Sequence, residues 1–122
     1  MQNRAINDIE VEKRRQIKLI NESMNYPSID LEFSRFNYSA DKICKEYEVP
    51  SENRATMLRS VAFTRGRLSF AHLAVKELSD IISASNDVDR REEIVQLAAV
   101  CVQWIESLDR NAERLRQERA KL

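Results

Sequence analysis

The chain has 122 residues, enough for one domain with a modest hydrophobic core. One glycine, two prolines and 33% charged residues favour long helices over a sheet that needs many turns. Twenty basic and twenty acidic residues cancel, so no overall field attracts nucleic acid or a membrane surface. We therefore expect a single all-α domain over residues 1–122, with neither nucleic acid nor a membrane as its partner.

The N-terminal sequence MQNRAINDIEVEKRRQ has charges where a secretion signal needs an apolar core, and no segment reaches the roughly 20 apolar residues of a membrane span. This pattern predicts a cytoplasmic protein. Cys44 and Cys101 lie far apart without metal-ligand spacing, so we expect two reduced thiols. Cys101 lies in the apolar run AAVCVQW and is expected in the core.

The first part of the chain is predicted to contain two helices separated by a loop. Residues 3–21 are expected to be helical, because isoleucines recur there at helical spacing among charged residues. Residues 26–38 contain Pro27 and several aromatic residues without a sustained period, which indicates an ordered surface loop. A short helix is expected over residues 39–48, before the Val-Pro pair.

Three more helices are predicted in the rest of the chain. The first covers residues 52–65 and ends at Gly66, and the second covers residues 69–85. The last covers residues 89–120, with Asp89 as its expected cap. The serines expected to cap the preceding helices are Ser39, Ser51 and Ser69.

The last predicted helix is apolar nearly all round between Ile94 and Ile105. Such a helix needs burial on several sides, which one protomer of this size can scarcely provide. We therefore expect a bundle of about four to five helices that assembles into a homo-oligomer, a dimer or larger.

Acidic residues interrupt the apolar pattern on two consecutive predicted helices. Glu77 and Asp80 lie in a row with Phe70 and Ala84 on the first helix, because the spacing alternates between three and four residues. Burying ionised carboxylates costs several kcal/mol unless a cation or hydrogen-bond donors compensate. On the next helix, Glu93 begins a second group of oxygen-bearing side chains. Two such groups on adjacent helices are an arrangement that can bind Mg²⁺.

These acids have an alternative interpretation in which all of them are solvated. Glu92 and Glu93 lie in the first turn of their helix, where the helix dipole favours acids without any ligand. Lys76 and Asp80 are four residues apart and could form a surface ion pair that contributes little. The spacing alone leaves both interpretations open.

The two acidic groups read KELSD at residues 76–80 and EIVQ at residues 93–96, with GRLSFAHL before them and LAAVCVQWIESLDR after them. Residues 66–110 resemble the MazG-like all-α nucleotide pyrophosphohydrolases, especially small phage and actinobacterial members, whose pattern is Glu-Glu-x-x-Glu followed by Glu-x-x-Asp. The sequence VEKRRQ near the N-terminus is also similar to these members. The resemblance implies an oligomeric helical bundle whose acids bind magnesium, which holds the triphosphate of a nucleotide.

Glu77, Asp80 and Glu93 match the metal-ligand pattern of the family, whereas Lys76 and Gln96 depart from it. Gln96 keeps a carbonyl oxygen that can still bind a metal weakly. Lys76 places a positive charge where the family has an anion, so it repels a metal and can occupy the position of the cation. The resemblance therefore implies a degraded site with weak or absent Mg²⁺ binding, and no residue is assigned a catalytic role.

The partner that the resemblance implies is a nucleotide or a nucleotide-derived small molecule. Arginine suits phosphate because its planar guanidinium donates two parallel hydrogen bonds, and aromatic rings can stack on a base. The candidate ligand-binding residues are Lys76, Arg54, Arg59, Arg65, Arg67, Arg90, Arg91, Tyr26, Phe33 and Phe36.

The expected function is binding or sequestration of this ligand with little turnover. For a phage member this would be an anti-defence role in the host cytoplasm. One alternative is an active magnesium-dependent nucleoside triphosphate pyrophosphohydrolase that uses Glu77, Asp80 and Glu93. The other is a structural or protein-inhibiting helical oligomer, which would leave Glu77 and Asp80 in their apolar row without an explanation.

Overall fold

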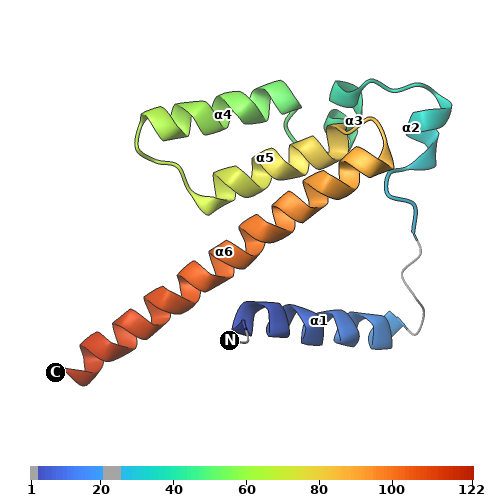
Figure 1. Cartoon of the computed structure of the whole chain (residues 1–122). Helices are drawn as coiled ribbons and strands as arrows, with labels where there is room; N and C mark the ends of the chain where they lie inside the picture. The colour runs from blue at the N-terminus through green and yellow to red at the C-terminus, as the bar shows by residue number, and fades with distance from the viewer. Residues whose placement is uncertain (1–2, 21–25) are drawn as a thin grey trace. The chain divides into compact units, whose positions relative to one another are not determined.

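The structure is a computed structural model that describes residues 3–20 and 26–122. Within these ranges it consists of helices and contains no strand, which confirms the all-α class. The helices are α1 (Arg4–Ile20), α2 (Leu31–Arg35), α3 (Ala40–Glu46), α4 (Glu52–Thr64), α5 (Phe70–Ser83) and α6 (Asp87–Ala120), as Figure 1 shows. In the part of the chain that the structure describes, no helix combines the length and the apolar character needed to cross a membrane.

The chain divides into two compact units. We call Met1–Tyr26 together with Val102–Leu122 the terminal unit, and Pro27–Cys101 the central unit. The helix α6 contributes its first part to the central unit and its remainder to the terminal unit. Each of the two units has its own internal contacts.

The central unit is organised around α5. The helix α4 lies alongside α5, and α3 also packs on α5 (Figure 1). Ala55 and Ala62 of α4 are buried, with 2% and 6% of their surface exposed. They are seven residues apart and therefore on one face, and their small side chains allow the two helix backbones to approach closely.

Buried groups of α5 tie it to the segments that precede it. Ser79 is fully buried, and its hydroxyl donates to the Pro50 carbonyl oxygen at 2.9 Å, so this polar group is satisfied inside the core. The Cys44 thiol of α3 is fully buried and lies 3.3 Å from the Ser83 hydroxyl. These contacts hold the C-terminal half of α5 against α3 and against the start of α4.

Three helices begin at the serines that the sequence predicts. The side chain of each serine accepts a hydrogen bond from the backbone three residues later, which is the common N-cap interaction. The pairs are Ser39 with Lys42, Ser51 with Arg54, and Ser69 with His72. At the start of α5 the His72 ring also accepts from the Ser69 backbone N–H and completes a reciprocal capping box.

The helices α2, α3 and α4 end in the same way. Each is followed by a residue with a positive φ: Asn37 at 54°, Glu48 at 58° and Gly66 at 66°. The next backbone N–H then bonds back to a carbonyl five residues earlier, as in the bond from Arg67 to Ala62 at 2.8 Å. This is the Schellman arrangement, in which glycine is favoured because it has no side chain to clash.

Several segments differ from the expectations. The loop expected over residues 26–38 contains α2, because the Asp30 side chain accepts from the Glu32 backbone N–H and starts a short helix. The helix α6 begins at Asp87 rather than at residue 89. Asn86 caps it by accepting from the Asp89 backbone N–H at 2.8 Å, so Asp89 lies inside the first turn. The described part of the chain therefore has six helices rather than four to five.

The last helix is only partly buried in the single chain. None of the residues of α6 is fully buried, and Cys101, which was expected in the core, is only half-buried. The reason is that the apolar residues between Ile94 and Ile105 surround the helix, whereas the neighbouring helices of the central unit pack mainly on α5. Apolar surface on α6 consequently stays exposed in the single chain.

In the terminal unit, the start of α1 contacts the second half of α6. The Asn3 amide donates to the Glu106 carboxylate at 2.9 Å, and Arg4 lies 4.0 Å from Asp109. Ala5 is buried beside these polar contacts. The predicted end of this helix near residue 21 lies outside the described residues.

Candidate functional site

Three carboxylates from two helices meet in the central unit. Glu77 and Asp80 lie on α5, three residues apart, and Glu93 lies on α6. One oxygen from each lies within 4.8 Å of the others, and all three residues are half-buried. We call these three residues the acid cluster. The sequence predicted the same three acids as metal ligands, and the fold brings them together.

Arg90 fixes the start of α6 against the end of α5. Its guanidinium donates from Nε to the Ile81 carbonyl at 3.0 Å and from Nη2 to the Ala84 carbonyl at 2.6 Å. Its Nη1 pairs with the Asp87 carboxylate at 2.5 Å, and only 12% of its side chain is exposed. Glu93 follows three residues later on the same face of α6, so this contact also directs Glu93 toward α5.

The role expected for Arg90 therefore changes. It was predicted to bind phosphate, yet its donors bond to backbone carbonyls and to Asp87. The carbonyls at a helix C-terminus lack partners within the helix, and a cation is favoured there by the helix dipole. Arg90 thus acts as a link between two helices.

Lys76 and Asp80 form a half-buried ion pair rather than a solvated surface pair. The Lys76 Nζ lies 2.5 Å from Asp80 Oδ2, with 16% and 13% of the two side chains exposed. The lysine contacts only one of the two Asp80 oxygens. Asp80 Oδ1 is buried without a hydrogen-bond partner in the described chain, and Glu77 Oε2 is in the same condition.

The charge of Glu77 is poorly compensated. Burial raises the pKa of its carboxyl group above the ordinary value of this side chain, and the negative charges of Asp80 and Glu93 raise it further. Lys76 and Arg59 act in the opposite direction without cancelling the shift. Buried acceptors without a hydrogen-bond partner are rare in folded proteins, and a bound cation can supply the missing partner.

The acid cluster fits a divalent cation by its donor set. All its potential ligand atoms are carboxylate oxygens, which Mg²⁺ and Ca²⁺ prefer. Two of these oxygens have no competing donor among the described residues. Three carboxylates and the Lys76 ammonium leave two negative charges, which a divalent cation would balance.

The other predicted metal ligand and the remaining arginines lie differently. Gln96 is exposed and lies on α6 three residues after Glu93, so its predicted part in metal binding stays a prediction. Arg59 lies on the face of α4 that packs on α5, four residues after Ala55 and three before Ala62, and its charge acts on Glu77. Arg59 is nevertheless exposed, as are the other predicted arginines, namely Arg54, Arg65, Arg67 and Arg91.

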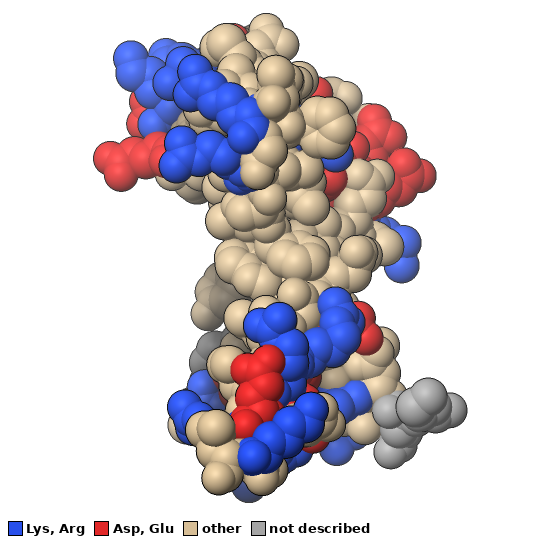
Figure 2. Space-filling view, turned by 90° about the vertical axis from the view of Figure 1, so that its left-hand side faces the viewer, with Lys and Arg blue, Asp and Glu red and all other residues tan. Residues whose placement is uncertain are grey.

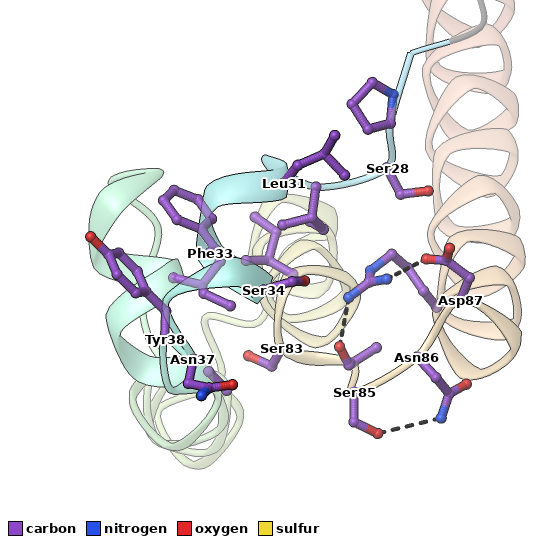
Figure 3. Close-up of a pocket in the computed structure, with 17 residues that line it drawn as sticks. Ser28, Leu31, Phe33, Ser34, Asn37, Tyr38, Ser83, Ser85, Asn86 and Asp87 are labelled. Atoms are coloured by element: carbon purple, nitrogen blue, oxygen red, sulfur yellow. Dashed lines mark hydrogen bonds and ion pairs between the residues drawn. The ribbon is translucent and has the colours of Figure 1, made fainter.

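A cavity of about 770 Å³ lies in the central unit, between the segment that follows Pro27 and the turn from α5 to α6. Figure 3 shows Leu31 and Phe33 from α2, Ser83 from α5, and Asn86 at the turn around this cavity. All its lining residues belong to the central unit.

Of the three aromatic residues predicted to bind a base, the cavity includes Phe33. Phe36 ends α2 and is 62% exposed, and Tyr26 belongs to the terminal unit and is 72% exposed. The polar lining residues were not predicted. The turn residues Ser85, Asn86 and Asp87 mark the end of the helix predicted over residues 69–85, but the sequence does not show that the segment after Pro27 covers them.

The surface charge agrees with the balanced composition. On the face that Figure 2 shows, basic side chains lie beside acidic ones, and a broad area carries neither.

Comparison of the chain with family models, curated proteins and solved structures finds no match. The MazG-like assignment of residues 66–110 therefore stays a prediction that rests on their motif.

Proposed function

We propose that this chain binds a nucleotide or a nucleotide-derived signal through a divalent cation held by Glu77, Asp80 and Glu93, with little turnover. One observation carries this proposal: two buried oxygens of the acid cluster, Glu77 Oε2 and Asp80 Oδ1, have no hydrogen-bond partner in the described chain. Leaving such groups unsatisfied costs about 1–3 kcal/mol each. A cation removes that cost, whereas solvated acids would not be buried in this way.

The phosphates are the part of the ligand that this site attracts. A divalent cation supplies an electrostatic contact for phosphate oxygens when bound to acidic side chains. Arg59 and Lys76 add two positive charges on the neighbouring faces of α4 and α5. The acid cluster, together with these two cationic side chains, is thus suited to an anionic ligand that binds along with a divalent cation.

The low turnover follows from Lys76. Its ammonium neutralises one Asp80 oxygen and so reduces the negative charge available for a cation. A weakly held cation polarises phosphate and water less effectively, which lowers the rate of hydrolysis. Binding of the intact ligand depends less on this charge than hydrolysis does.

Binding of Mn²⁺ as a spectroscopic substitute for Mg²⁺, followed by electron paramagnetic resonance, tests the cation site. We expect one Mn²⁺ per chain, at least tenfold weaker binding for Glu77→Gln, and unchanged binding for the exposed neighbour variant Glu92→Gln. Lys76→Glu should bind Mn²⁺ at least tenfold more tightly. No Mn²⁺ binding by any variant, including Lys76→Glu, would contradict the proposal.

Incubation with nucleoside triphosphates and cyclic nucleotides in the presence of Mg²⁺ tests turnover. We expect retention of intact ligand that is released on denaturation. Rapid pyrophosphate release that is lost in Glu77→Ala would instead identify an active pyrophosphohydrolase. A stable oligomer without any ligand binding would favour the structural function.

The homo-oligomer belongs to the same proposal, and the exposed apolar surface of α6 supports it. Ile94 and Val95 are 47% and 55% exposed, and on α4 Phe63 is 72% exposed. Large apolar side chains exposed in such number are costly in water and are commonly covered by a partner surface. Light scattering after size exclusion should give a dimer or larger, and a monomer at all concentrations would contradict this part.

A further inference from the structure

We propose that the cavity between the segment after Pro27 and the α5–α6 turn binds the nucleoside part of the ligand, base and sugar, while its phosphates lie at the acid cluster. This inference rests on the function proposed above. It adds a second contact region to the acid cluster. It also names the chemical class of the group that this region binds, which is an uncharged, flat ring system that forms hydrogen bonds.

The size and walls of the cavity suit a ring. Its volume of about 770 Å³ lies within the common range for small organic ligands and is far larger than a metal ion or a phosphate needs. Leu31, Phe33, Ile43 and Ile82 provide an apolar wall. Such a wall favours the face of a base over water.

The aromatic part of this wall is held in place. The Phe33 ring stacks on Tyr38 with centroids 5.0 Å apart, and it meets Tyr47 edge-on at 5.4 Å. The Tyr47 hydroxyl also accepts from the Asp30 backbone N–H at 2.9 Å, which ties the start of α2 to α3. A wall fixed by its own contacts needs little reordering when a ligand binds, and this favours affinity.

Polar groups at the cavity can recognise the edge of a base or a sugar. The Asn37 amide and the Ser34 hydroxyl line the cavity, and both residues are exposed, so a ligand can reach them. An amide both donates and accepts, as the edges of bases do, and a hydroxyl can pair with a sugar hydroxyl. Figure 3 shows both residues beside the cavity.

The charges of the cavity exclude phosphate from it. Arg90 is the basic residue in its lining, and its guanidinium already bonds to Ile81, Ala84 and Asp87. Asp87 adds a negative charge to the rim. An anion would therefore meet a carboxylate and no available cation, so the part of the ligand that enters is uncharged.

The cavity begins about one helical turn from the acid cluster along both α5 and α6. On α5, the cavity residue Ser83 follows Asp80 by three residues, which is about 4.5 Å along the helix axis. On α6, the cavity residue Arg90 and Glu93 are three apart, about 4.5 Å. One molecule with an anionic end and an uncharged ring end can therefore reach both, and a nucleoside phosphate has this form.

Calorimetry with the full chain and saturating Mn²⁺ can test this arrangement. The probes are ATP, GTP, CTP and UTP, each compared with inorganic tripolyphosphate, which has the phosphates without a nucleoside. Ala40→Trp should fill the cavity, because Ala40 is an exposed residue of its lining at the start of α3. Ala71→Trp is the matched control, since Ala71 is an exposed residue near the start of α5 that does not line the cavity.

We expect at least one nucleoside triphosphate to bind the wild-type protein tenfold or more tightly than tripolyphosphate. Ala40→Trp should abolish this preference and leave tripolyphosphate binding unchanged, whereas Ala71→Trp should keep the preference. Equal binding of all five probes by the wild-type protein would overturn the inference while the proposed cation site remained supported. No binding of any probe would overturn both.

A measurement on the unmodified protein covers the case in which Ala40→Trp does not fold. Methyl resonances of Ile43 and Ile82 should shift when the preferred nucleoside triphosphate is added, and tripolyphosphate should leave them in place. Shifts of the same size with both probes, or no shift with either, would show that the nucleoside does not enter the cavity.

Discussion

The substitution Glu77→Gln should stabilise the protein when no divalent cation is present. Glutamine keeps the size of the side chain and removes its negative charge. In the wild-type chain Glu77 Oε2 is buried without a donor, and the carboxylates of Asp80 and Glu93 lie close to it. The amide of glutamine can also donate a hydrogen bond to a neighbouring carboxylate, which the wild-type carboxylate cannot do.

The magnitude follows from the geometry of the acid cluster. Two unit charges at 4.8 Å, the upper limit for the oxygens of the cluster, repel by about 1 kcal/mol at the dielectric constant of water and by about 3.5 kcal/mol at an effective value of 20. Lys76 offsets the charge of Asp80, so the repulsion from Glu93 is the one left uncompensated. For a half-buried group we expect Glu77→Gln to raise the free energy of unfolding by about 1–3 kcal/mol at neutral pH.

The effect should depend on pH with a defined sign. Burial raises the pKa of Glu77 in the folded state above its ordinary value of 4.5. The folded protein therefore holds the proton more tightly than the unfolded chain does. The stability associated with Glu77 is fully present below pH 4.5 and is lost as the pH rises through the raised pKa. The difference between variant and wild type should thus be small at about pH 4 and reach its maximum at neutral pH.

Urea unfolding between about pH 4 and pH 8, at one protein concentration and with a chelator present, measures this difference. Fixed concentration is needed because assembly would contribute to stability. Glu92→Gln is the control, because Glu92 is exposed and should show no such trend. A destabilised Glu77→Gln at neutral pH, or a difference that does not change with pH, would refute the reasoning. With Mn²⁺ at about 100 times its Kd the wild type should gain about 2.7 kcal/mol, and the variant much less.

Three further predictions concern residues outside the acid cluster. Glu48→Gly should raise the free energy of unfolding by about 0.5–1 kcal/mol in urea titrations, because a φ of 58° strains glutamate and does not strain glycine. Ser79→Ala should lower it by about 1–2 kcal/mol in the same assay, because the Pro50 carbonyl would lose its buried donor; a neutral effect would mean that water replaces the hydroxyl. Arg90→Gln should weaken Mn²⁺ binding about tenfold in paramagnetic resonance titrations by releasing α6 from α5, whereas the exposed control Arg91→Gln should not.

Three of the helix starts and one of the helix ends could be predicted because they depend on a few neighbouring residues. A serine that caps a helix bonds to the backbone three residues away, so Ser39, Ser51 and Ser69 were recognisable without tertiary information. Gly66 was recognisable as a helix end for the same reason, since it adopts the positive φ that its lack of a side chain allows. Glu48 ends α3 with a similar φ and carries no such signal.

The site was predictable only in part. The row of acids on α5 was visible from spacing, and the fold brings Glu93 to it. The function of Arg90 was not visible, because its acceptors are backbone carbonyls of another helix, and any sequence would supply those. The cavity was also hidden, since its wall combines α2, α3 and the α5–α6 turn.

By itself, the sequence determined the all-α class, the approximate span of five of the six helices and the positions at which acids interrupt an apolar row. These properties follow from periodicity and capping, which act within one or two helical turns. Only the tertiary structure decided that Lys76 contacts one Asp80 oxygen and leaves the other buried without a donor. Burial and hydrogen bonding depend on which helices pack together, and the order of residues along one helix does not specify its neighbours.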